Sequence, residues 1–155
     1  MKTAKTVVVI LGVVALAVSA VRADEALERA VGARQSLMNL NSFNLGILGD
    51  MAKGAVEYNA EAAQAAADNL QALASLNHMA LWPQGSDNVS LPGKTRALPV
   101  IWEQYPAILE KVEVFRTATA SMAAVASDGL EAVQGNIKTV GDACNGCHDV
   151  NRAPR

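Results

Sequence analysis

The chain has 155 residues, of which 51% are hydrophobic, 18% charged and 4% aromatic, with two cysteines and a formal net charge of −2. This length indicates one domain that is large enough to fold without cross-links. Two cysteines are too few for a disulfide framework, and the lack of any Lys/Arg-rich run excludes the basic surface that nucleic-acid binding needs.

Residues 1–23 are typical of a secretory signal peptide. Two lysines precede an uncharged apolar run, and the small residue Ala23 closes the segment. Cleavage after Ala20 is an alternative. A membrane anchor is another, although the apolar run is shorter than the ~20 residues that a spanning helix needs. We therefore predict export to the periplasm and a mature domain over residues 24–155.

Cleavage after Ala23 changes the charge balance. It leaves 132 of the 155 residues and removes Lys2, Lys5 and Arg22, so 10 basic residues remain against 15 acidic ones, a net charge of −5. An acidic domain predicts a basic patch on any partner protein that docks with it.

The first half of the mature chain predicts two helices, because alanine is abundant and apolar residues recur at helical spacing. The first spans residues 24 to about 51. Its expected inward stripe is Leu27, Val31, Arg34, Met38, Asn41, Leu45 and Leu48. The second spans residues 60 to about 77, with Asn59 as its N-cap. Its expected inward stripe is Ala63, Ala66, Leu70, Leu73 and Asn77.

Residues 78–105 predict a long connection, since proline, glycine and other turn residues recur there at short intervals. Its expected anchors are Leu81, Trp82, Leu98, Ile101 and Trp102. A third helix starts near Pro106, which the first turn tolerates, and runs to about residue 126. The fourth follows a capping box of Asp128 and Glu131 and ends near residue 150. Four helices with one long connection predict an all-α, antiparallel four-helix bundle.

A motif for cofactor attachment lies near the C-terminus, Cys144-Asn145-Gly146-Cys147-His148. C-x-x-C-H is the attachment signature of c-type haem, in which both thiols form thioethers with the porphyrin and the histidine ligates iron. Export agrees with this chemistry, because c-type haem is attached outside the cytoplasm. We predict one covalent haem c, held by Cys144 and Cys147, with His148 as an axial iron ligand.

The spacing within the fourth helix predicts where that haem lies. One seam, at steps of three and four, comprises Leu130, Val133, Ile137, Val140, Cys144 and Cys147. The apolar seam therefore leads directly to both cysteines. We expect the haem between helices near one end of the bundle, packed against the first helix.

Other interpretations of the two cysteines were considered. A thioredoxin-like redox pair needs a βαβ context that a helical sequence lacks. A zinc site needs further ligands, and His78 is the only other histidine, with no other cysteine. A disulfide between helical residues three apart would be strained. A periplasmic thiol oxidoreductase that uses the two cysteines remains the remote alternative.

The second axial position of the iron has several candidate ligands: His78, Met38, Met51, Met79 and Met122. A methionine more often fills a core than binds a metal. Met38 is the best placed, because it shares the predicted stripe of Arg34.

Three separated segments resemble the cytochrome c′ family. They are the C-x-x-C-H motif followed by Asp149 and Arg152, the segment Arg34-Gln35-Ser36-Leu37-Met38, and the segment Thr95-Arg96-Ala97-Leu98-Pro99-Val100-Ile101-Trp102. The resemblance covers essentially the whole mature chain. It implies a four-helix bundle that commonly forms homodimers through its first two helices.

The resemblance also implies roles for residues around the haem. Arg34 and Gln35 would lie by the propionates, with Thr95 and Arg96 at the haem edge. Arg152 would lie over the proximal face near His148.

The distal face and one proximal position complete that comparison. Met38 would occupy the distal face, where it either shields an open iron or binds it as the sixth ligand. Asn151 departs from the family, which usually has an aromatic residue before this arginine.

These observations predict a periplasmic monohaem cytochrome that transfers single electrons and binds NO or CO at a five-coordinate iron. A low-spin electron carrier with Met38 as sixth ligand is the alternative. No set of residues for substrate turnover is visible, so we do not expect an enzyme.

Overall fold

Four long helices make up most of the computed structural model, which describes residues 3–154 and the side chains of residues 24–154. They are α1 (Thr3–Ala52), α2 (Ala60–Ser75), α4 (Tyr105–Ala123) and α5 (Leu130–Asn151), and the connection between α2 and α4 contains the 3₁₀ turn η1 (Met79–Leu81) and the short helix α3 (Val100–Glu103). An isolated bridge between Ala97 and Arg152 is the only strand-like pairing within residues 3–154. The predicted all-α class is confirmed.

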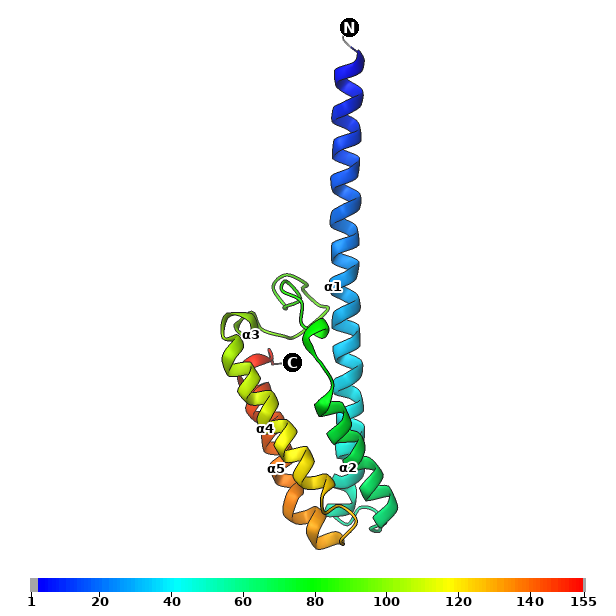
Figure 1. The fold of residues 1–155 in the computed structure, drawn as a ribbon, viewed down its shortest axis with the longest axis vertical. Helices are drawn as coiled ribbons and strands as arrows, with labels where there is room; N and C mark the ends of the chain where they lie inside the picture. The colour runs from blue at the N-terminus through cyan, green and yellow to red at the C-terminus, as the bar shows by residue number, and fades with distance from the viewer. Residues whose placement is uncertain (1–2, 155) are drawn as a thin grey trace.

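The helices form two antiparallel pairs. α1 packs mainly against α2 and α5, and α4 packs mainly against the same two helices, so α1 and α4 lie diagonally. Figure 1 shows α1 and α2 side by side, with α4 and α5 as the second pair. The predicted antiparallel bundle with one long connection is therefore confirmed. The expected cleavage point after Ala23 falls within α1.

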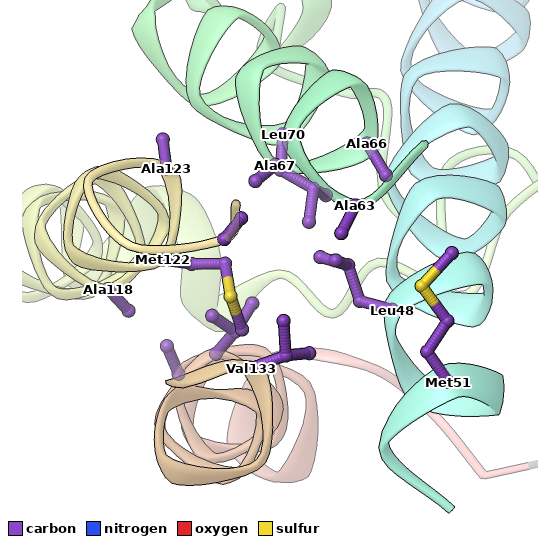
Figure 2. Packing of buried hydrophobic residues seen from close by; sticks show 13 residues of the cluster. Leu48, Met51, Ala63, Ala66, Ala67, Leu70, Ala118, Met122, Ala123 and Val133 are labelled. Carbon is purple, nitrogen blue, oxygen red and sulfur yellow. The ribbon is translucent and has the colours of Figure 1, made fainter. Parts of the chain in front are cut away.

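The hydrophobic core occupies the half of the bundle where α1 and α4 end and α2 and α5 begin. Leu48, Leu70, Met122 and Val133 are fully or almost fully buried there. Figure 2 shows them converging from the four helices, with the small alanines of α2 allowing close approach. On α5 this core continues through Val140 and Ala143, so it reaches the residue before Cys144.

Most of the predicted stripes are confirmed. The buried members of the predicted sets are Val31, Arg34, Leu48, Ala63, Ala66, Leu70, Val133 and Val140. On α1, however, Met38 is 38% exposed, whereas Leu37 and Asn44 are buried. The inward face of α1 is therefore wider than one stripe, because the helix contacts α2 on one side and α5 on the other. Asn77 lies beyond the end of α2 and is exposed.

The predicted helix starts have mixed outcomes. Asn59 caps α2, its side chain accepting a hydrogen bond of 2.8 Å from the Ala62 N–H, and proline lies in the first turn of α4. The capping box at Asp128 is wrong. Gly129 is the N-cap of α5 and has φ 134° and ψ 168°, a backbone conformation open to glycine. This extra residue places Asp128 one position too early to cap the helix.

The apolar length of the helices can be judged over residues 24–154, whose side chains are described. None of the helices there is long and apolar enough to cross a bilayer.

Candidate functional site

The C-x-x-C-H motif lies on the last turns of α5. Cys144 and Cys147 are three residues apart, so they share a face, and both are half-buried with free thiols. Burial raises the pKa of both thiols. At Cys144 the neighbouring Cys147 raises the pKa further. At Cys147 a hydrogen bond from Asn151 and the charges of Lys111 and Arg152 oppose the increase. A reactive redox cysteine needs a lowered pKa, so these thiols do not resemble an oxidoreductase pair.

His148 is half-buried beside the two cysteines. Burial lowers the pKa of its imidazole, and the positive charges of Arg152 and Arg96 lower it further, while Asp149 acts in the opposite direction. The neutral imidazole is the form that ligates a metal. The residues around His148 therefore favour the protonation state that an axial ligand needs.

The end of α5 is tied to the connection between α2 and α4. The Leu98 N–H donates to the Asn151 carbonyl at 3.0 Å, and the Ala153 N–H donates to the Arg96 carbonyl at 2.8 Å. The Arg96 guanidinium also donates to the Ala153 carbonyl at 3.2 Å. Because of these bonds, the predicted site residue Arg96 lies at the same corner as Arg152, which pairs with Ala97.

Asn151 is buried at this corner, with 7% of its surface exposed. Its side-chain amide donates to the Cys147 carbonyl at 2.9 Å and lies 3.7 Å from the Cys147 sulfur. The polar residue that stands where the family usually has an aromatic one is thus bonded through its amide nitrogen, and it contacts a cysteine of the motif.

Arg34 is the most connected polar side chain of α1 and is only 3% exposed. Its guanidinium donates to the Ser86 hydroxyl and the Thr95 hydroxyl, both at 2.7 Å, and also to the Ser86 carbonyl. It lies 4.7 Å from the ring centre of Trp82. Burial lowers the pKa of Arg34, and the nearby Asp87 acts in the opposite direction. Arg34 therefore joins α1 to the long connection, and Thr95 is one of its partners there.

The interaction of Gln35 follows the same pattern. Its side-chain amide donates to the Lys94 carbonyl at 2.8 Å. Arg34 and Gln35 therefore hold adjacent residues of one loop segment.

The position of Met38 follows from the register of α1 against α5. The Gln134 amide donates to the Ala52 carbonyl at 2.9 Å, and Leu45 and Gly141 line one shallow groove. Leu45 lies seven residues before Ala52 on α1, and Gly141 lies seven residues after Gln134 on α5. The two antiparallel helices therefore keep the same register over this distance. A further seven residues on each helix place Met38 level with His148 along the bundle.

The other candidate iron ligands lie elsewhere. Met51 and Met122 belong to the core at the opposite half of the bundle, and Met79 is 71% exposed. The Nε2 atom of His78 lies 2.9 Å from the Leu73 carbonyl oxygen. Met38 therefore remains the favoured candidate of the five.

The described side chains do not form a metal site of their own. Across the described part of the chain, no group of three or more His, Cys, Asp or Glu side chains could hold a metal ion. By contrast, the donor set at the end of α5 fits a c-type haem: two thiols on one face that continues the apolar core, a neutral histidine beside them, and arginines close by for carboxylates.

Some contacts of this site could not be found from the sequence. Ser86 and Trp82 lie about 50 residues from Arg34, and no local pattern links them. Lys111 carries no motif either, and only the packing of α4 on α5 brings its charge toward Cys147.

Comparison with known proteins gives consistent matches. The family model described as Cytochrome C′ matches residues 29–152. Cytochrome c-554 of Cereibacter sphaeroides is 40% identical over 126 residues, covering 81% of this chain and 82% of the relative. A solved cytochrome c′ from Rhodobacter Spheriodes has a TM-score of 0.80 and 31% identity, over 83% of this chain and 98% of that one. A second solved cytochrome c′, described as having an unusual ligand-controlled dimer dissociation, has a TM-score of 0.77 and 29% identity, over the same shares.

Proposed function

Because the chain belongs to the cytochrome c′ family, whose cofactor is haem c, we propose that it is a periplasmic monohaem cytochrome that transfers single electrons and binds NO or CO. The observation that carries this proposal is the alignment of Cys144, Cys147 and His148 with the end of the apolar core, with Met38 level with His148. When bound, the haem supplies a one-electron iron centre and a coordination position for small gases.

The proposed roles of α5 follow from its contacts. Each thiol adds across one vinyl group, so a carbon–sulfur bond forms and the thiol proton passes to the other vinyl carbon. Asn151 holds Cys147 through two atoms while the end of α5 is tied to Leu98. Such partners keep attachment residues in one orientation. His148 is the proposed axial ligand, with Arg152 over the proximal side.

We assign the propionate side to the segment around Arg34. Arg34 and Gln35 hold the loop that carries Thr95 and Arg96. A guanidinium neutralises a carboxylate and donates to it in a fixed geometry. The proposed role of Arg34 is therefore double: it positions the loop, and its charge lowers the cost of burying a propionate.

The distal side distinguishes two versions of this function. In the favoured version the iron is five-coordinate and Met38 shields the open side, so that small uncharged gases enter. In the alternative, the Met38 thioether is the sixth ligand. The position of Met38 at the same height along the bundle as His148 supports this alternative.

Met38→Ala distinguishes the two versions by absorption spectroscopy and CO association kinetics. For the five-coordinate version we expect a high-spin spectrum that the substitution leaves unchanged, with CO binding severalfold faster because the shield is gone. Met79→Ala, at an exposed methionine, is the matched control and should change neither. A methionine-to-iron charge-transfer band that disappears only in Met38→Ala would establish the alternative instead.

We further propose a homodimer through α1 and α2, as the sequence resemblance implies. Leu40 and Phe43 on α1 are 51% and 66% exposed, and Leu76 next to α2 is 53% exposed. Exposed apolar residues on adjacent helices are suited to an interaction surface.

Phe43→Lys is expected to shift the sedimentation coefficient of the holoprotein from that of a dimer to that of a monomer, because a charge would be buried in the interface. Val114→Lys on α4, at a similarly exposed apolar residue, should leave the dimer intact. A wild-type monomer would contradict the proposal.

A further inference from the structure

Two arginines flank the haem-attachment motif at the end of α5. Backbone hydrogen bonds pair residues 96–98 with residues 151–153, so Arg96 and Arg152 lie at one corner of the bundle. The Arg152 N–H donates to the His148 carbonyl at 3.1 Å, which fixes it one turn from the proposed axial ligand. Arg152 is exposed and Arg96 half-buried, so this corner presents positive charge at the surface.

Lys111 adds a third cation from α4. Met122 and Val133 point toward one another across the core in Figure 2, and the two helices are antiparallel. Lys111 lies eleven residues before Met122 on α4, and Cys144 lies eleven residues after Val133 on α5. Lys111 is therefore level with Cys144. In agreement, the charge of Lys111 acts to lower the pKa of Cys147.

Among the residues with described side chains, these three cations form no ion pair with a carboxylate. The ion pairs within residues 24–154 are Lys94 with Glu28, Arg116 with Glu113, and Lys138 with Asp142. None of them involves Arg96, Lys111 or Arg152. Asp149 opposes the two arginines at His148, and Glu110 precedes Lys111 on α4.

The distribution of charge along the bundle is therefore uneven. Many acidic residues lie toward the other end, where α1 and α4 end and α2 and α5 begin: Asp50, Glu57, Glu61, Asp128 and Glu131. Charges further apart than ~10 Å are largely screened at physiological salt. A partner that docks near the motif therefore senses the local cations more than the net charge of the whole chain.

We propose that Arg96, Lys111 and Arg152 form a basic docking surface over the haem-attachment end of α5, and that it receives a carboxylate-rich patch of a redox partner protein. This proposal is an alternative to the expectation, drawn from net charge alone, that the partner patch is basic. The proposal rests on the proposed electron-transfer function.

The test uses the reduced holoprotein and two small oxidants of opposite charge, hexacyanoferrate(III) and a cationic cobalt(III) phenanthroline complex. In each reaction one electron leaves the protein and reduces the reagent. We expect the rate with hexacyanoferrate to fall as ionic strength rises, and the rate with the cobalt complex to rise, because the oxidants sense the cations. Polyglutamate should slow the reaction with hexacyanoferrate by competing for the same surface.

Lys111→Glu and Lys53→Glu provide a matched pair. Both change the total charge equally, but Lys53 is exposed just past the end of α1, far from the motif. We expect Lys111→Glu to slow the reaction with hexacyanoferrate severalfold at low ionic strength, and Lys53→Glu to leave it near the wild-type value. Haem content and reduction potential, measured for both variants, separate a docking effect from an altered cofactor.

Two results would overturn the proposal. One is a wild-type rate with hexacyanoferrate that rises with ionic strength, because net charge would then govern the encounter. The other is an equal effect of the two lysine substitutions. A holoprotein that exchanges electrons with neither oxidant would instead contradict the proposed function itself.

Discussion

The double variant Cys144→Ser, Cys147→Ser is expected to lose covalent haem completely. A serine hydroxyl is a far weaker nucleophile than a thiol and does not add to the vinyl groups. Each single variant retains one possible thioether and should keep a reduced amount of haem. Asn145→Ser, in the same turn and exposed, is the control and should retain full haem.

Denaturing electrophoresis with haem staining and intact-mass measurement of the periplasmic fraction provide the readout. The wild-type mass should exceed that of residues 24–155 by one haem, which also tests the proposed cleavage after Ala23 against cleavage after Ala20. A wild-type chain with two titratable thiols and no covalent haem would contradict the proposal and favour the thiol oxidoreductase. The raised pKa values of both thiols already argue against that alternative.

The helices and the attachment motif were accessible from the sequence, because both depend on residues that are close along the chain. Apolar residues three and four apart define the buried faces of α2 and α5, and Asn59 caps α2 through a residue three positions away. The failure at Asp128 has a local cause as well. The pattern of a capping box was present, but the backbone of Gly129 starts the helix one residue later.

The site beyond the motif was only partly accessible, because its contacts join distant segments. The sequence placed Arg34 on an inward stripe, but it did not show Ser86 and Trp82 as its partners. Net charge gives no location of charged groups for a similar reason. It averages over the chain, whereas the fold gathers Arg96, Lys111 and Arg152 at one corner.

Replacing Arg34 with methionine should cause a large loss of stability. The change removes hydrogen bonds to the Ser86 and Thr95 hydroxyls and to the Ser86 carbonyl, together with the contact on Trp82. Buried acceptors left without a donor each cost about 1–3 kcal/mol. Some are partly compensated, since the Ser86 hydroxyl also donates to the Pro83 carbonyl. We expect the free energy of unfolding to fall by about 3 kcal/mol.

Chemical denaturation of the holoprotein measures this loss, and Arg29→Met is the matched control. Arg29 lies on the same helix but is exposed, so its replacement should change the free energy of unfolding by no more than about 0.5 kcal/mol. Arg34→Lys should be intermediate, because one ammonium group cannot replace a planar fork that reaches Ser86 and Thr95 together. If Arg34 positions the loop, limited proteolysis of Arg34→Met should cut first within residues 81–95. Equal stability of the Arg34→Met and Arg29→Met variants would contradict this role of Arg34. The long connection would then be held by its tryptophans and by its pairing with the end of α5.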